Sequence, residues 1–585
     1  MAEADYSKDL LYDEVGLRRM KDSYLINGEI SPQERLVKIC NTFGSDDPHR
    51  RRLYEYTSNH WLSLSTPILC YDEENKYSFP ISCYLCYLDD KIPSIISTLS
   101  ETNFLSVCGG GVSVKIGLRS KSNKSTGSLA HIKTYDSSVL AYKQGSRRGS
   151  YAVYMDINHP EIIEFIDMRK PTGDHNIRCM NIHHAVNITD DFMKIIEQCT
   201  YNTNFNDNWD LVDPHTKKVV KTVSARILWQ RIIDTRMQTG EPFLCFVDTC
   251  NEFMNKYQKE KGMKINQSNL CTEIIVPTNA QRSSLCCLSS LNMEYYDEWK
   301  GNEEFIHDVM EMLDNVLELF IDKALSNNFS RTLLSKVLDS AMNEKNIGIG
   351  LMGFHSYLQK NMISIESDTA KNVNIDVFKW LKDTTDKCNS SLGRSRGSPP
   401  DISESGKRFA YTMAVAPTAT TSIIMGNTSP STEPYRANIY RQDTISGSQY
   451  NKNKHLNNLL ISKGYGPKLM GKIWHSIIMN DGSVQHLPEN LLSKEEKDVF
   501  KTFIEIDQLK LVELAAERQH YIDQGQSLNL TFNPDADVNI LHKAHLSAWK
   551  LKLKTLYYCR SAKVSSADKL VLDDVKFKTC SSCES

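Results

Sequence analysis

The chain has 585 residues, of which 40% are hydrophobic and 24% charged, so it can bury a large core and exceeds the usual size of one compact domain. Its 69 basic and 72 acidic residues leave a formal net charge of -3, which excludes a global electrostatic attraction to nucleic acid or to an anionic membrane. A substrate must therefore be recognised locally.

The first residues, MAEADYSKDLLYDEVG, are acidic where a secretory signal is basic and then apolar. No window of the sequence approaches the roughly 20 apolar residues that a membrane span needs. We therefore expect a cytoplasmic protein without a membrane segment. The 16 cysteines lack the dense, even spacing of a secreted disulfide scaffold, so reduced thiols are expected.

Residues 1–62 are predicted to be a small helical region, with Ser31 as N-cap and Pro32 in the first turn of the helix in SPQERLVKIC. Over residues 63–561, strand-like runs alternate with amphipathic helical stretches such as DDFMKIIEQC and QLKLVELAAERQHYI. The strand-like runs include VSVKI, SYAVYMDI, EIIVPT, IGIGLM and YTMAVAP. The alternation predicts an α/β domain whose strands deliver loops to a central site. The periodicity then fails, so residues 562–585 are expected to form a flexible tail.

Two glycine- or threonine-rich stretches each have two interpretations. GIGLMG (348–353) matches a dinucleotide-binding pattern, but the polar residues before it favour a glycine-rich barrel strand. In APTATTSIIMGN (416–427), Pro417 at a helix start would leave backbone N–H groups and hydroxyls free to bind phosphate. An ordinary well-capped helix explains that stretch equally well.

The grouped cysteines and histidines raise the question of a metal. Cys83 and Cys86 together with Cys580 and Cys583 could hold zinc, but the two pairs are far apart in sequence, and a buried structural cysteine is the commoner outcome in a run like SCYLCYL. The terminal pair could exchange disulfides or could be idle. The histidines of NIHHAV have no carboxylate or cysteine at a familiar ligand spacing, so no metal is expected there.

Two further segments complete the candidates. In NQSNLCTEIIVPT (266–278), Cys271 stands between Asn269 and Glu273, just before an expected buried strand. In TLYY (555–558), two adjacent tyrosines are expected at the end of a helical run, where most such pairs are core or interface aromatics.

Taken in order, STPIL, ISCYL, SNLCTEI, LCCLSSLN, IGIGLMG, APTATTSIIMGN…STEPY, AAERQHYIDQGQSLNL and KTLYYCR resemble the catalytic large (α) subunit of class I ribonucleotide reductase. The resemblance runs from about residue 10 to the C-terminus. It implies a ten-stranded α/β barrel whose central finger loop carries Cys271. It also implies that the chain reduces ribonucleoside diphosphates to deoxyribonucleotides.

In this resemblance, Cys271 is the thiyl-radical residue that removes the 3′ hydrogen of the ribose. Glu273, two positions along an extended chain, would lie on the same side and accept the 3′-hydroxyl proton as general base. Asn269 would hold the sugar by hydrogen bonds. Cys83 and Cys286 match the dithiol that supplies the reducing electrons, with Cys286 favoured over its neighbour because C-x-L-S-S-L-N follows it in the family register.

The resemblance also implies partners. Cys580 and Cys583 match a tail dithiol that re-reduces the internal pair and is itself reduced by thioredoxin or glutaredoxin. Tyr557 and Tyr558 match the stepping-stone pair that passes a radical in from a metal-bearing small (β) subunit. No metal or other cofactor is therefore expected in this chain.

Substrate and effector contacts follow from the same resemblance. The expected substrate-binding residues are Thr66, Ser82, Gly110, Asn269, Glu273, Pro417, Thr418, Ala419, Thr420 and Thr421. An effector, a dNTP or ATP, is expected at Asp90, Lys91, Ile92, Arg119 and Arg148, in the region through which two α subunits would form a homodimer. Without the family, the stretch YKQGSRRGSY that contains Arg148 would be interpreted as a solvated basic turn.

The chain departs from the family pattern in two places. Too few residues precede STPIL for the ATP-cone of larger relatives, so control of overall activity through such a cone is expected to be absent. Phe243 stands where many relatives have tyrosine, so no role for that hydroxyl is carried over. Two alternatives stay open: a cobalamin-dependent reductase, disfavoured by the tyrosine pair, and a non-catalytic nucleotide-binding or zinc-stapled scaffold, disfavoured by the set Asn269, Cys271 and Glu273.

Overall fold

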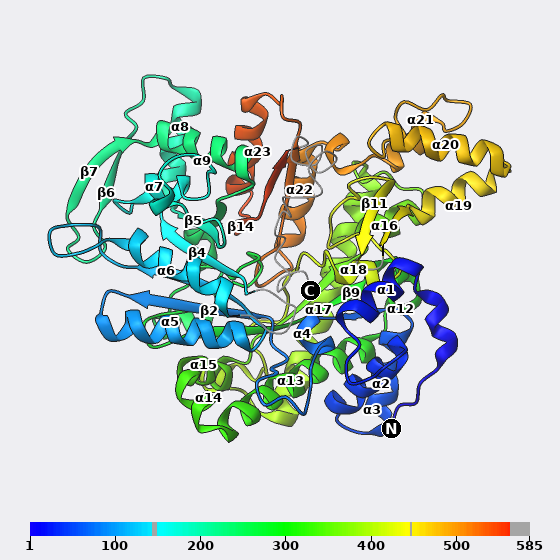
Figure 1. Ribbon diagram of the computed structural model, residues 1–585, viewed down its shortest axis with the longest axis horizontal. Helices are drawn as coiled ribbons and strands as arrows, with labels where there is room; N and C mark the ends of the chain where they lie inside the picture. The colour runs from blue at the N-terminus through cyan, green and yellow to red at the C-terminus, as the bar shows by residue number, and fades with distance from the viewer. Residues whose placement is uncertain (143–148, 445–446, 562–585) are drawn as a thin grey trace.

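The N-terminal region is helical, as predicted. The computed structural model describes residues 1–142, 149–444 and 447–561. Helices α1 (Glu14–Ser23), α2 (Pro32–Phe43) and α3 (Asp47–Ser58) lie at the lower right of Figure 1. The Ser31 hydroxyl caps α2 by accepting a hydrogen bond from the Gln33 backbone N–H. Buried side chains of these helices share one hydrophobic core with the outer helices of the rest of the chain, so the region packs onto the larger body.

The first half of the main sheet is parallel. Its strands, in spatial order, are β2 (Cys83–Asp89), β3 (Gly111–Gly117), β4 (Tyr151–Asp156), β5 (His183–Ile188) and β8 (Phe243–Phe246). Helices connect them on the outside: α5 (Ile92–Val107), α6 (Ser128–Ala141), α7 (Ile162–Asp167), α8 (Asp190–Tyr201) and α9 (Ala225–Thr239). Successive residues alternate between two cores, so that Tyr154 packs in an inner cluster and Val153 in the outer one.

Strand β9 (Ser284–Asn292) joins this half to the second. It pairs antiparallel with β2 and with β1 (Leu62–Leu64), and parallel with β10 (Ile347–Met352). Beyond β10, the bridges Ile349↔Met413 and Val415↔Gln526 continue the sheet. The circuit closes where β14 (Thr555–Leu556) pairs with β8 and β15 (Cys559–Ser561) pairs with β13 (Leu530–Phe532).

The described residues thus form a closed barrel of ten segments. In order around the circuit these are β9, β2, β3, β4, β5, β8, 555–561, 524–532, 411–416 and β10. The expected α/β barrel is confirmed, although the 411–416 segment is joined only by single bridges. IGIGLM forms barrel strand β10, as preferred over a dinucleotide turn. A Cβ at Gly350 would lie 2.4 Å from the Ala414 backbone oxygen, so glycine permits this close approach.

Helices of the second half cover the barrel's outside. The long ones are α13 (Glu303–Ser326), α15 (Ser335–Glu344), α17 (Asp368–Arg396), α22 (Gln508–Gln519) and α23 (Val538–Lys550). Short helices occur along the whole chain: α4 (Thr66–Leu69), α10 (Val247–Glu252), α11 (Lys256–Glu260), α12 (Tyr296–Trp299), α14 (Asn328–Leu333), α16 (Phe354–Lys360) and α18 (Thr421–Ile424). Within the described residues, no helix is both long and apolar enough to cross a membrane.

Two appendages extend from opposite sides of the barrel in Figure 1. The hairpin of β6 (Asn208–Val212) and β7 (Val219–Ser224) lies at the left, beside α8. At the upper right, the hairpin of β11 (Ile439–Thr444) and β12 (Gly447–Lys452) leads to α19 (Lys454–Ser462), α20 (Pro467–Met479) and α21 (Lys494–Val499). These three helices have a hydrophobic core of their own.

The segment EIIVPT is not a strand, which corrects the prediction made from its β-branched residues. It belongs to a loop, residues 263–278, that passes through the barrel without regular secondary structure. Its side chains Ile274, Ile275 and Val276 are buried among inner-face residues. The loop is apolar because the barrel interior surrounds it, rather than because it pairs in a sheet.

Candidate active site

The loop of residues 263–278, which carries Cys271, is the expected finger loop. Both halves of the barrel hold it by hydrogen bonds. From the first half, the Tyr154 hydroxyl donates to the Asn269 backbone oxygen at 2.6 Å, and the Gln267 amide donates to the Cys86 backbone oxygen at 2.8 Å. From the second, the Ser527 hydroxyl donates to the Cys271 backbone oxygen at 2.6 Å. Cys271 therefore lies at a fixed point in the interior, with 1% of its surface exposed.

The chain turns tightly at Cys271 instead of running extended. Thr272 has a φ of 70°, and its N–H donates to the Asn269 backbone oxygen at 3.3 Å. The Asn269 side-chain oxygen accepts a hydrogen bond from the Ile274 N–H at 3.0 Å, which closes the turn. We expected Glu273 to lie on the same side as Cys271 because the chain between them would be extended. The chain is not extended there, so that argument is wrong.

The turn nevertheless brings the polar groups of this loop to Cys83, at the start of β2. The Asn269 amide donates to the Cys83 sulfur at 3.3 Å, and the Cys83 thiol lies 3.8 Å from a Glu273 carboxylate oxygen. The other Glu273 oxygen accepts from the Ser527 hydroxyl at 3.1 Å. An amide, a carboxylate and a thiol thus converge within the barrel.

Strand pairing sets Cys83 directly opposite Cys286 on β9. Paired antiparallel residues have Cα atoms about 4.5–5.5 Å apart, which is within the range of disulfides. Both side chains pack in the same inner cluster, whereas Cys287 packs in the outer core. Burial raises the pKa of Cys286 well above its usual value, with the adjacent Cys83 adding to the effect, so its thiol stays protonated.

Cys86 points away from Cys83, because residues three apart on a strand face opposite sides of a sheet. Cys86 is fully buried in the outer core, while Cys83 faces inward. These two thiols cannot bind one zinc ion, which removes the basis of the zinc-stapled interpretation. Cys580 and Cys583 lie outside the described residues.

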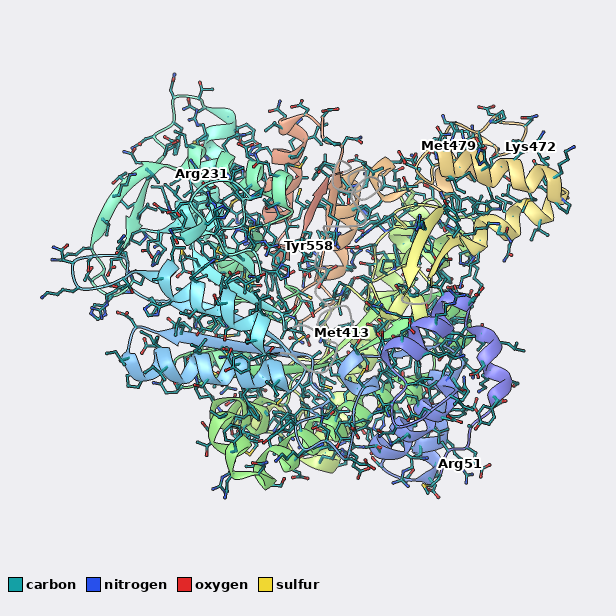
Figure 2. The ribbon with its side chains drawn as sticks, viewed as in Figure 1. Arg51, Arg231, Met413, Lys472, Met479 and Tyr558 are labelled. Atoms are coloured by element: carbon teal, nitrogen blue, oxygen red, sulfur yellow. The ribbon has the colours of Figure 1, made fainter. Side chains whose placement is uncertain are left out.

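Tyr557 connects Cys271 to a second tyrosine. Its hydroxyl donates to the Cys271 sulfur at 3.4 Å, and its ring centroid lies 4.3 Å from that of Tyr558. The ring of Phe243 packs on both, at 4.6 Å and 4.8 Å. Figure 2 shows Tyr558 near the middle of the molecule, and its side chain is only partly buried.

The tyrosines were expected at the end of a helical run, and this is wrong. Helix α23 ends at Lys550, and both tyrosines lie in the extended segment between β14 and β15 that closes the barrel. The Arg236 guanidinium, buried beneath this segment, donates to the Tyr557 backbone oxygen at 2.9 Å and also to the Pro242 backbone oxygen. Sequence patterns did not identify Arg236, because an arginine on an amphipathic helix is usually solvated.

Two of the segments expected to bind substrate, those of Ser82 and of Pro417–Thr421, adjoin the inner cluster. Ser82 is buried beside Cys83, and the Thr66 hydroxyl, in α4, lies 3.3 Å from the Tyr24 hydroxyl. At Gly110 a Cβ would lie 2.2 Å from the Tyr84 ring, so only glycine fits there. Ala416 packs in the same inner cluster as Cys83, so the Pro417–Thr421 stretch begins at the site.

Pro417 does not start a helix, contrary to the prediction. Helix α18 begins at Thr421 and has four residues. Thr418 adopts a left-handed φ of 45°, and its hydroxyl accepts a hydrogen bond from the Ser431 N–H at 2.7 Å. This contact fixes a turn that precedes the helix. Thr418 and Thr420 therefore belong to a buried loop, and Thr421 alone of these threonines lies in the first helical turn.

The expected effector residues meet at the far end of β2. Arg119, just after β3, donates to the Asp90 carboxylate at 2.5 Å, and His215 lies 3.4 Å from the same carboxylate. Lys91 precedes α5 and pairs with Asp89 at 3.2 Å. Ile92, at the start of α5, is 73% exposed. Arg148 lies outside the described residues.

Among the described residues, His49, Asp308 and Glu311 have ligand atoms close enough to hold a metal ion. Arginines already pair with both carboxylates: Arg52 with Asp308 at 2.6 Å and Arg396 with Glu311 at 2.6 Å. Two cationic side chains at the carboxylates oppose a metal cation there. The group is better explained as a buried ion-pair network between α3, α13 and α17.

The comparisons with known proteins agree with this arrangement. Residues 81–401 and 399–559 match the family model described as "Ribonucleotide reductase, barrel domain". The chain is 45% identical to a ribonucleoside-diphosphate reductase large subunit of Invertebrate iridescent virus 3, over 100% of both chains. It is 35% identical to that of Invertebrate iridescent virus 6, over 97% of this chain and 94% of the relative.

A solved structure is also similar. The Actinobacillus ureae class Id ribonucleotide reductase alpha subunit superposes with a TM-score of 0.82 at 33% identity, covering 96% of this chain and 98% of that one. The family match extends over most of the chain, and the closed barrel surrounds the finger loop in the way that the sequence resemblance implies. The chain therefore belongs to the family of class I ribonucleotide reductase large subunits.

Proposed function

We propose that this chain reduces ribonucleoside diphosphates to deoxyribonucleotides with a thiyl radical on Cys271. The observation that carries the proposal is the contact of the Tyr557 hydroxyl with the Cys271 sulfur at 3.4 Å, backed by Tyr558 at a ring distance of 4.3 Å. A buried thiol that acted as an ordinary nucleophile would need a base, whereas a radical thiol needs a route for oxidation. The tyrosine pair provides that route.

The radical reaches Cys271 in two hydrogen transfers. The Tyr558 phenoxyl radical takes the hydroxyl hydrogen of Tyr557, and the Tyr557 radical then takes the thiol hydrogen of Cys271. Each transfer breaks one bond to hydrogen and forms one, so no charge builds up inside the barrel. A metal-bearing small subunit is the proposed partner that oxidises Tyr558.

At the sugar, the Cys271 radical removes the 3′ hydrogen while Glu273 accepts the 3′-hydroxyl proton. The 2′ C–O bond then breaks and the oxygen leaves as water. Cys83 and Cys286 together give up two hydrogens, one to that water and one to C2′, and form a disulfide. Cys271 finally returns hydrogen to C3′ and Glu273 returns the proton to the 3′ oxygen, which restores the 3′-hydroxyl and regenerates the Cys271 radical. Asn269 binds the sugar in this proposal, which its amide's hydrogen bond to the Cys83 sulfur supports.

The remaining assignments extend this proposal. The substrate diphosphate binds at Pro417, Thr418, Ala419, Thr420 and Thr421, with Thr66, Ser82 and Gly110 completing the substrate contacts. Cys580 and Cys583 return electrons to the internal disulfide, and thioredoxin or glutaredoxin reduces them. A dNTP or ATP effector binds at Asp90, Lys91, Ile92, Arg119 and Arg148, next to a homodimer interface, and the enzyme works in the cytoplasm.

Turnover of the four ribonucleoside diphosphates, measured with a candidate small subunit and a dithiol reductant, tests the proposal. The chain is expected to form deoxyribonucleotides, and a Cys271→Ser variant is expected to form none above the rate without enzyme. A matched Cys250→Ser variant changes a thiol that is buried in the same hydrophobic cluster as Cys271, and it is expected to retain turnover. Deoxyribonucleotide formation by Cys271→Ser would refute the radical role.

A further inference from the structure

A buried carboxylate lies behind the tyrosine pair, at a position that the reaction steps above do not use. Glu241 lies two residues before the start of β8 and has 1% of its surface exposed. One of its oxygens lies 2.6 Å from His183 Nδ1, and the other lies 3.1 Å from His184 Nδ1 and 3.4 Å from Arg169 Nε. Adjacent histidines of one strand thus contact the same carboxylate.

Strand alternation sends these two histidines to opposite faces of the barrel. His184 packs on Phe165 of helix α7 and contacts the Ile166 backbone oxygen at 3.1 Å. His183 faces the tyrosines instead, with its Nδ1 lying 3.4 Å from the Tyr558 hydroxyl. The two residues therefore share a carboxylate but have different surroundings, so one is a natural control for the other.

The charge on Glu241 fixes where the proton of His183 lies. Burial alone would raise the pKa of Glu241, but the Arg169 guanidinium and the two histidines hold it well below its usual value. An ionised carboxylate can only accept hydrogen bonds. At 2.6 Å from it, His183 Nδ1 must carry a proton, so that nitrogen cannot accept the hydroxyl hydrogen of Tyr558. The Tyr558 oxygen is instead a second acceptor for the same N–H.

We infer that His183, oriented by Glu241, is a positioning residue for radical transfer: its Nδ1–H donates to the Tyr558 oxygen and keeps that oxygen in place while the hydroxyl hydrogen leaves and returns. A phenoxyl radical has lost its own donor but still accepts hydrogen bonds, so the contact persists in both states. The inference rests on the proposed radical route and adds two residues to it.

The surroundings of His183 fit a role in orientation. Its ring stacks on Phe243, with centroids 5.9 Å apart and planes 22° apart, and Phe243 in turn packs on both tyrosines. The Arg560 guanidinium lies over the Tyr558 ring, 4.9 Å from its centroid. The ring planes are therefore held by packing, and the His183 contact fixes the oxygen along a further direction.

Two substitutions at His183 separate hydrogen bonding from packing. In His183→Asn, the amide NH2 occupies the place of Nδ1–H and keeps a donor, whereas His183→Leu fills similar space without one. Loss of one neutral hydrogen bond is expected to lower kcat of His183→Leu roughly tenfold, with KM for the ribonucleoside diphosphate unchanged. His183→Asn is expected to recover most of kcat. His184→Asn, the control, is expected to change thermal stability more than kcat.

A second readout does not depend on turnover. With 3-fluorotyrosine at position 558, fluorine NMR follows ionisation of that one phenol. A donated hydrogen bond stabilises the phenolate, so the phenol pKa is expected to be higher in His183→Leu than in the parent and in His183→Asn. Equal phenol pKa values in the parent and in His183→Leu would overturn the inference, as would an unchanged kcat in His183→Leu. If the parent forms no deoxyribonucleotide, the proposed function fails, and the NMR titration still decides the hydrogen bond.

Discussion

Replacing Cys286 and Cys287 by serine one at a time separates the two faces of β9. Cys286 faces Cys83 in the barrel, and the Gln524 amide can donate to its sulfur at 3.7 Å. Serine there keeps a polar partner, so stability is expected to change little, but the electrons for reduction are lost. Turnover of Cys286→Ser should fall to that of Cys271→Ser.

Cys287 is fully buried in the outer core, where burial raises the pKa of its thiol. A serine hydroxyl in this apolar place is expected to cost about 1–3 kcal/mol of unfolding free energy. For domains smaller than this chain, each kcal/mol lowers Tm by about 2–4 °C, so a fall of a few degrees is expected. The kcat of Cys287→Ser should stay near that of the parent, because the Cys287 thiol does not face the site.

The assay pairs steady-state turnover, with dithiol reductant and small subunit present, with thermal unfolding of each variant. The expected result is a crossed pattern, in which Cys286→Ser is stable and inactive and Cys287→Ser is active and less stable. An inactive Cys287→Ser with unchanged Tm, or an active Cys286→Ser, would contradict the face assignment made from the register of β2 and β9.

Three further changes test the barrel and the groups behind the tyrosines. Gly350→Ala should cost about 1–3 kcal/mol in urea unfolding, because its Cβ would meet the Ala414 backbone oxygen at 2.4 Å; an unchanged midpoint would contradict the close approach. Arg236→Leu should cost about 2–5 kcal/mol, since the Tyr557 backbone oxygen and another buried acceptor lose their donor; a loss under about 1 kcal/mol would refute this. Glu241 has a lowered pKa in the folded chain, so its contribution to stability is complete above its ordinary pKa of 4.5 and is lost as the pH falls below it. Glu241→Gln should therefore flatten the fall of Tm as the pH is lowered below about 4.5, and parallel curves for the two proteins in that range would contradict the ionised carboxylate.

The helices and several barrel strands could be predicted from sequence because their patterns are local. Ser31 and Pro32 mark the start of α2 whatever packs against it, and the glycines of IGIGLM together with the polar residues before them favour a strand over a nucleotide turn. EIIVPT misled the prediction because a loop enclosed by a barrel has the same apolar, β-branched composition as a buried strand.

The site was predictable in its residues more than in its geometry. Cys271 and Glu273 could be matched to a motif, but the left-handed turn at Thr272 has no signature in a β-branched residue. His183 and Glu241 are far apart in sequence, and their contact depends on the neighbouring places of β5 and β8 in the sheet. The role inferred for His183 therefore could not be predicted from the sequence and depends on the fold of the barrel.

The account's central claim is that oxidation of Cys271 passes through Tyr557. Deoxyribonucleotide formation by Tyr557→Phe, assayed with the small subunit and compared with the parent and with Cys271→Ser, tests it most directly. Phenylalanine preserves the ring that packs on Phe243 and Tyr558 but removes the hydroxyl that contacts the sulfur. The account predicts a folded protein whose product formation is no higher than that of Cys271→Ser. Substantial turnover by Tyr557→Phe would contradict it and would require a radical formed beside the site.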